Sequence, residues 1–138
     1  MSPYGDLVQE KDVLKQAERL LKAAADRTRL RILKMLEPGP LCVCQIVEAL
    51  GLSQSAVSRH LSILCAAGLL EDEPRGKWTY YGIARPTQEE ARRLLALVRC
   101  CAGEDPDVDR DRARAASEKI RSLPSCCGPK ARVRRTRP

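Results

Sequence analysis

Two cysteines stand two residues apart in the apolar stretch PLCVCQI, residues 40–46. Residues two apart in a regular helix point about 200° from one another, so Cys42 and Cys44 can share one ion only at a helix end or outside a helix. At a helix N-terminus both sulfurs lie near unpaired backbone N–H groups and the positive end of the helix dipole. That environment favours the thiolate, which is the form that binds soft ions. The pair is therefore the main candidate for a thiol-based metal site.

Five more cysteines bear on this chemistry. Four of them form adjacent pairs that could supply further thiolates or form sites of their own: Cys100 with Cys101, and Cys126 with Cys127. Cys65 lies on an apolar helical face and is expected to be a small core residue. A disulfide framework is not expected, because a reducing cytosol keeps cysteines as thiols and seven of them cannot all pair within one chain. Structural zinc is also not expected, since it needs four nitrogen or sulfur ligands and His60 is the only histidine.

The stretch SQSAVSRHLSILCAAG, residues 53–68, predicts an amphipathic helix that could contact DNA. Val57, Leu61 and Leu64 fall on one face, and the opposite face is polar. Forked side chains on such a face can bond to base edges, and short hydroxyls let the helix approach phosphates, although a polar face is also typical of a helix that is merely solvated. The candidate DNA-binding residues are Ser53, Gln54, Ser55, Ser58, Arg59 and His60, together with Arg75 and Lys77 in the later turn. We expect His60 to be structural or to touch phosphate, not to bind metal.

Periodicity predicts the elements that position these residues. Apolar residues at three- and four-residue steps, with capping residues, predict helices over 7–25, 26–37, 43–50, 53–68 and 87–101. The period changes over residues 69–83, which predicts a two-stranded hairpin with a turn at 74–77. Residues 107–123 predict a sixth helix with few apolar positions, which needs support from a partner or is only partly ordered.

Two short helices joined by a tight turn at Gly51 and followed by a hairpin are the elements of a winged helix-turn-helix, in which the second helix enters the major groove. The expected fold class is therefore mainly α with a small β-hairpin. A winged helix-turn-helix domain for DNA binding and dimerisation is expected at residues 1–103, an extra C-terminal helix at 104–123, and a flexible basic tail with cysteines at 124–138.

The formal charge of +7 is weak evidence for DNA binding by the folded part, because five basic residues after Gly128 leave only +2 on residues 1–127. No apolar run approaches the roughly 20 residues that cross a bilayer, and the polar N-terminus is unlike a secretory signal. We therefore expect a cytoplasmic protein without a membrane partner.

Three stretches together resemble the ArsR/SmtB family of metal-responsive repressors, specifically its arsenic-responsive ArsR branch: DRTRLRILKML, LCVCQIVEALGLSQSAVSRHLSILCAAGLLE and RGKWTYYGI. The resemblance covers about residues 20–100. It implies a homodimer, formed through the first and fifth helices, that binds an inverted-repeat DNA operator and leaves it when the inducer binds. It also implies that Cys42 and Cys44 bind arsenite or antimonite, with no organic cofactor.

The family's third cysteine corresponds to Val47 in this chain. Another cysteine, a hydroxyl or water could complete the site, or the inducer could be a methylated arsenical that needs only two thiolates. Cadmium and lead also tolerate all-sulfur sites. Binding is expected to distort the start of the third helix and thereby reorient the fourth.

Two rival functions use the same cysteines. A redox-sensing repressor of the same fold would respond to thiol oxidation. A thiol oxidoreductase or arsenate reductase would need alternating strands and helices around the reactive thiol, which this helical sequence lacks. An enzyme is therefore not expected.

Overall fold

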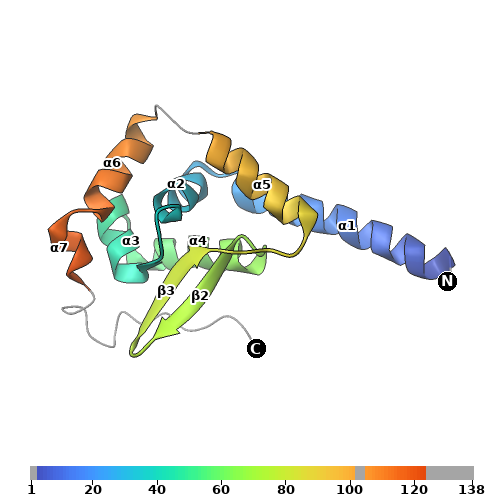
Figure 1. Cartoon of the computed structure of the whole chain (residues 1–138), viewed down its shortest axis with the longest axis horizontal. Coiled ribbons are helices and arrows are strands. Elements are labelled where there is room, and N and C mark those ends of the chain that lie inside the picture. Colours follow the sequence, from blue (N-terminus) through green and yellow to red (C-terminus); the bar gives the residue numbers. More distant parts are fainter. Residues whose placement is uncertain (1–2, 102–104, 124–138) are drawn as a thin grey trace.

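The computed structural model describes residues 3–101 and 105–123, with side chains from Val13 onward (Figure 1). In these ranges the helices are α1 (Pro3–Ala24), α2 (Arg27–Leu36), α3 (Val43–Leu50), α4 (Gln54–Ala66), α5 (Glu89–Cys100), α6 (Pro106–Ala115) and α7 (Glu118–Arg121). The strands are β1 (Leu41–Cys42), β2 (Leu70–Arg75) and β3 (Trp78–Ile83). None of the helices in these ranges is both long and apolar enough to cross a membrane.

The helix-turn-helix is formed by α3 and α4, as the sequence predicts. Gly51 ends α3 with a φ of 71°, a left-handed conformation that glycine adopts without a Cβ penalty. Ser53 then caps α4, because its Oγ accepts a hydrogen bond from the N–H of Ala56 at 3.2 Å. The apolar face of α4, formed by Val57, Leu61 and Leu64, is fully buried. This packing fixes the angle between the two helices and leaves the opposite face of α4 outward.

The predicted hairpin is formed by β2 and β3, and a third strand that the sequence analysis did not predict, β1, extends it. The strand order is β1-β3-β2, and β1 pairs with β3 so that Cys42 lies opposite Tyr80. The additional strand forms because β2 covers only one edge of β3, and the two residues before α3 pair with the other. The turn is also tighter than predicted: Pro74 and Arg75 lie in β2, with Arg75 opposite Trp78. A proline is tolerated there because β2 is an edge strand.

Two helix boundaries differ from the predictions. Helix α1 begins at Pro3, and α5 begins at Glu89 after the N-cap Gln88. Figure 1 shows α1 and α5 side by side at one end of the molecule. Both helices bury one face against the core and leave leucines exposed on another.

The predicted sixth helix is two helices, α6 and α7, which we call the C-terminal strap. Asp105 caps α6, because its Oδ1 accepts hydrogen bonds from the N–H groups of Asp107 and Val108. Ala115 and Ile120 are buried in the common core, and Figure 1 shows the strap beside α3. The expectation that this segment needs a partner or is partly ordered was therefore wrong, because α2 and α3 of the same chain support it.

Candidate thiol site and nucleic-acid interface

Cys42 and Cys44 converge at the start of α3. Cys42 is both the last residue of β1 and the N-cap of α3, while Cys44 lies in the first turn. Their Sγ atoms are 2.8 Å apart, with Cys42 only 2% exposed and Cys44 half-buried. Two sulfurs at this separation can both lie at a bonding distance of about 2.3 Å from one ion. The arrangement therefore suits a soft, thiol-seeking ion.

Gln45 holds the backbone at this site, a role that the sequence reasoning missed. Its Oε1 accepts a hydrogen bond from the N–H of Cys42 at 2.9 Å, in a capping box that starts α3. Its Nε2 donates to the carbonyl oxygens of Ile120 at 3.3 Å and Arg121 at 3.5 Å in α7. The spacing of a cap residue and a glutamine three positions later was the available signal, with cysteine in place of the usual serine or threonine. One buried amide thus joins the thiol site to the strap.

Tyr80 joins the thiol site to the wing, and the sequence reasoning missed it as well. It lies opposite Cys42 in the β1–β3 pairing. Burial raises the pKa of Tyr80, and nearby charge on Cys42 and on Cys44 raises it further, whereas Arg75 lowers it. The Arg75 guanidinium lies 4.6 Å from the centre of the Tyr80 ring. A shift of Cys42 can therefore displace Arg75 on the wing, because the Tyr80 ring lies between them.

The other cysteines among the described residues do not join this pair in a group of potential metal ligands. Cys100 and Cys101 are exposed at the end of α5, and Cys65 is half-buried against the core. Within the described ranges, no three or more histidine, cysteine, aspartate or glutamate side chains are placed to hold a metal ion together. Cys126 and Cys127 lie outside the described residues.

The candidate DNA-binding residues lie on α4 and on the wing. Ser53, Gln54, Ser55 and Arg59 are exposed, as are Arg75 and Lys77, whereas Ser58 is half-buried. Ser53 is partly occupied by its capping bond, and Arg75 by an ion pair with Glu73 at 2.6 Å. Arg59 and Lys77 are therefore the basic side chains best placed to reach a duplex.

His60 faces α2 and not the outer surface of α4. Its Nδ1 lies 3.2 Å from an amino group of Arg29 and 3.9 Å from a carboxylate oxygen of Asp26. Asp26 is the N-cap of α2, although its side chain makes no capping bond and instead lies 3.7 Å from Arg29. These contacts give His60 a structural role between α2 and α4.

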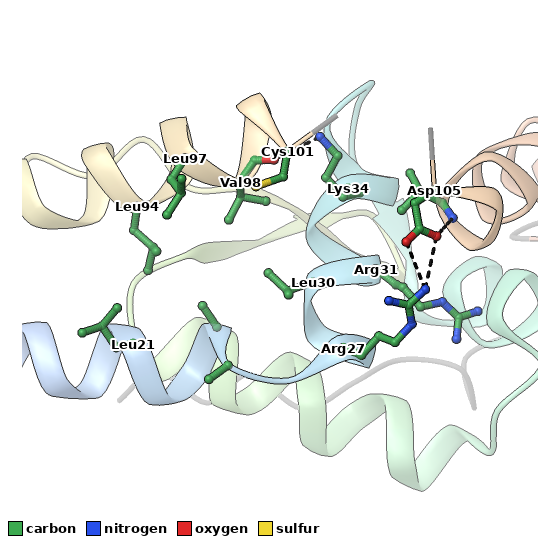
Figure 2. Close-up of a pocket in the computed structure, with 13 residues that line it drawn as sticks. Leu21, Arg27, Leu30, Arg31, Lys34, Leu94, Leu97, Val98, Cys101 and Asp105 are labelled. Carbon is green, nitrogen blue, oxygen red and sulfur yellow. Dashed lines mark hydrogen bonds and ion pairs between the residues drawn. The ribbon is translucent and has the colours of Figure 1, made fainter. Parts of the chain in front are cut away.

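An apolar hollow of about 350 Å³ lies between α1, α2 and α5 (Figure 2). Leu21, Leu30, Leu94 and Leu97 surround it, and Cys101 lies at its rim. The side chains of Leu21 and Leu97 are 60% and 59% exposed. Exposed leucines gathered around one hollow are typical of protein–protein contact surfaces.

A helix-turn-helix whose second helix has a polar outer face, followed by a wing with Arg75 and Lys77 near its turn, defines a winged-helix DNA-binding regulator. The model of the family described as "Bacterial regulatory protein, arsR family" matches residues 26–72. The arsenical resistance operon repressor of Bacillus subtilis (strain 168) is 37% identical over 91 residues, which cover 65% of this chain and 84% of that protein. The arsenical resistance operon repressor of Escherichia coli (strain K12) is 48% identical over 87 residues, covering 62% and 74%.

Two solved structures share the fold. A homodimeric winged helix-turn-helix DNA-binding domain from Mycobacterium bovis, titled a possible ArsR-family regulator, matches with a TM-score of 0.58 and 36% identity, over 66% of this chain and 82% of that one. Reduced HlyU from Vibrio cholerae matches with a TM-score of 0.57 and 31% identity, over 69% and 98%. The chain belongs to the ArsR/SmtB family, in the branch of the arsenical resistance repressors, and is a DNA-binding transcriptional regulator and not an enzyme.

Proposed function

We propose that this protein is a dimeric repressor that leaves its operator when trivalent arsenic or antimony binds Cys42 and Cys44. The observation that carries the proposal is the 2.8 Å separation of their Sγ atoms at the N-cap of α3. The names of the relatives, which are arsenical resistance repressors, support the choice of inducer. We infer a cytoplasmic location for this function, because thiols stay reduced in the cytosol.

The DNA contacts would come from α4 and the wing. We place α4 in the major groove, where Gln54 and Arg59 bond to base edges while Ser53, Ser55 and Ser58 lie near phosphates. Arg75 and Lys77 would contact backbone phosphates or the minor groove beside it. A symmetric dimer is needed for an inverted-repeat operator, and the exposed leucines on α1 and α5 form the surface that a second copy would cover.

Release would follow from the several roles of Cys42. Its backbone pairs with β3, its N–H is bonded to Gln45, and its sulfur faces Cys44. An ion that fixes both sulfurs at its own bond lengths and angles would shift this backbone, and with it the start of α3 and the β1–β3 pairing. Since α3 sets the orientation of α4, and Tyr80 contacts Arg75, both DNA-contacting elements would move together. Such coupling typically amounts to about 1–3 kcal/mol.

The number of ligands that the site can offer determines which inducer it can bind. Arsenite takes three ligands, whereas a methylated arsenical takes two thiolates besides its carbon substituent, and the described residues bring only Cys42 and Cys44 together. Cadmium and lead would also suit sulfur ligands. We therefore regard inorganic and methylated trivalent arsenic as the two principal inducer candidates.

The proposal is tested by Cys42→Ser, with Cys65→Ser as the matched control. Both variants are expected to bind DNA selected from a randomised duplex library as tightly as wild type, because neither residue is assigned to the DNA interface. Arsenite should release wild type and Cys65→Ser, as measured by fluorescence anisotropy, and leave Cys42→Ser bound. Normal release of the Cys42→Ser variant would defeat the proposal.

Thiol oxidation is a second candidate, because the same 2.8 Å juxtaposition also suits disulfide formation. Two thiols would give their two protons and two electrons to hydrogen peroxide, forming one S–S bond and two waters. Peroxide would then release DNA with no arsenical present, and a dithiol reductant would restore binding. Absence of release by peroxide removes this candidate and leaves the arsenic proposal intact.

A further inference from the structure

We propose that Gln45 positions the Cys42–Cys44 pair for its inducer, and that the C-terminal strap acts on the pair through the Gln45 side chain. This inference rests on the proposed function and deepens it, because it names a residue and a segment that set the affinity of the site. Gln45 acts through the backbone of Cys42, so it is a positioning residue and does not itself bind the ion.

The two sulfurs meet because the backbone changes conformation between Cys42 and α3. Cys42 is extended, with a φ of −83° and a ψ of 164°, whereas Cys44 lies in the first turn of α3. In a regular helix, residues two apart point about 200° from one another, so a helical Cys42 would turn its sulfur away from Cys44. A hydrogen bond of 2.9 Å from the N–H of Cys42 to Oε1 of Gln45 holds this extended residue at the start of α3. The 2.8 Å separation of the sulfurs therefore depends on where that amide oxygen lies.

The strap determines which way the Gln45 amide faces. Gln45 is 5% exposed, and its Nε2 donates to the carbonyl oxygens of Ile120 at 3.3 Å and Arg121 at 3.5 Å in α7. A flipped amide would place Oε1 against these two carbonyl oxygens and Nε2 against the N–H of Cys42. Buried polar groups that lose their partners destabilise the fold, so the flipped orientation is disfavoured. The carbonyl groups of α7 therefore keep Oε1 directed at Cys42.

The strap is itself fixed to the helix-turn-helix. Asp111 is 1% exposed and accepts two hydrogen bonds from Arg31 of α2, at 2.8 and 2.9 Å. Arg114 donates to the carbonyl oxygen of Glu48 in α3 at 2.9 Å. In α7, the side chain of Ile120 is 3% exposed and packs in the common core. The carbonyl groups of α7 are thus held relative to α2 and α3, and they support the Gln45 amide.

A pair of thiols that is held in place binds an ion more tightly, because the cost of ordering the pair is met when the chain folds and not when the ion binds. In metal sites, replacing a residue that orients the ligands lowers the affinity by about 10- to 100-fold. Loosening Gln45 should therefore weaken any ligand that needs both sulfurs. It should not slow a reagent that needs only one of them, and this difference separates positioning from a loss of thiolate charge.

Two probes provide this comparison, in reduced, full-length protein whose other cysteines are all replaced by serine. Methylarsenite, CH₃As(OH)₂, needs both Cys42 and Cys44. Each thiol forms one As–S bond as one As–OH bond breaks, and its proton leaves with the hydroxide as water, with no change in oxidation state. Iodoacetamide alkylates a single thiolate, so its rate at Cys44, followed by mass spectrometry, reports the charge and exposure of that sulfur alone.

The first test is Gln45→Leu, which removes the bonds on both sides of the amide. Its methylarsenite affinity, measured by calorimetry, should fall by about 10- to 100-fold, whereas alkylation of Cys44 should be as fast as in the parent protein or faster. Glu48→Gln is the matched control, because Glu48 lies on the same helix and pairs with Lys119 of α7 at 3.8 Å but does not contact Cys42. The control should keep its methylarsenite affinity within a factor of about two.

The second test asks whether the strap acts through Gln45. Ile120→Ala, which loosens the packing of α7, should lower the methylarsenite affinity by more than about two-fold when Gln45 is present. In the Gln45→Leu background the same change should have no further effect beyond a factor of about two, because the connection is already broken. Arg114→Ala, which removes an exposed bond of the strap to α3, gives the same comparison if Ile120→Ala does not fold.

Unchanged methylarsenite affinity in Gln45→Leu would overturn the inference. An alkylation rate that falls together with the affinity would also overturn it, because the loss would then come from thiolate charge. Equal losses from the strap variant with and without Gln45 would show that the strap acts by another route. The proposed function has a separate criterion, since it fails only if Cys42→Ser still releases DNA in response to arsenite.

Discussion

The Arg31–Asp111 ion pair offers a quantitative test of how the strap is attached. Asp111→Ala removes a carboxylate that is 1% exposed and leaves the guanidinium of Arg31, which is 18% exposed, without that partner. The hydrogen bond to Asp111 raises the pKa of Arg31 in the wild type. Without that bond the guanidinium still stays charged, because the ordinary pKa of arginine already lies above any accessible pH. The substitution therefore leaves a mostly buried cation unpaired.

The magnitude follows from this burial. Removing one partner of a buried ion pair costs about 3–5 kcal/mol of folding free energy. Arg31 retains a path to water, so the cost should lie somewhat below that range, at about 2–3 kcal/mol. Asp109→Ala, an exposed aspartate on the same helix, is the matched control and should change stability by no more than about 0.5 kcal/mol.

Urea unfolding followed by circular dichroism, at one fixed protein concentration because the protein is proposed to be dimeric, measures both variants. The double variant Arg31→Ala/Asp111→Ala should be less destabilised than the sum of the two single variants, since it leaves no unpaired charge. A difference below about 1 kcal/mol between Asp111→Ala and Asp109→Ala would refute a strap held by this pair.

Three further predictions address DNA binding, assembly and folding. Arg59→Ala should weaken operator binding by about 1–3 kcal/mol and relax sequence preference. Lys77→Ala should weaken binding to all sequences alike and lower the slope of log affinity against log salt concentration by about one. Fluorescence anisotropy at several salt concentrations measures both effects. Leu97→Glu should leave helix content unchanged but give monomers in sedimentation velocity, because it places a charge on the proposed dimer face; a stable dimer would contradict that assignment. Gly51→Ala should lower the free energy of unfolding by about 1–2 kcal/mol, because a φ of 71° is strained for alanine even though nothing lies within 4 Å of the added Cβ. Thermal unfolding measures this loss, and an unchanged midpoint would show that the turn relaxes.

The helix-turn-helix could be predicted from the sequence because its signals are local. Gly51 and Ser53 mark the turn within three residues, and the spacing of Val57, Leu61 and Leu64 defines the buried face of α4. The position of Cys42 at a helix N-terminus followed from the same local reasoning.

The contacts that connect the thiol pair to its surroundings could not be predicted in this way. Gln45 meets Ile120 across 75 residues, and Arg31 meets Asp111 across 80. Helical periodicity measures only how apolar one face of a helix is. The strap is held largely by arginines and aspartates, so its sequence gives no sign of the contacts that support it. Pairing of Cys42 with Tyr80 likewise depends on β3 having a second open edge, which no short stretch of sequence reveals.

The central claim is that the Cys42–Cys44 pair and the DNA-binding surface are linked, and reciprocity tests it most directly. Arsenite affinity should be measured for reduced wild type with and without saturating operator DNA, and DNA affinity with and without saturating arsenite. The account predicts that DNA weakens arsenite binding by the same factor by which arsenite weakens DNA binding, about 5- to 150-fold, and that Cys42→Ser abolishes both effects. Arsenite affinity that is the same with and without DNA would contradict the account.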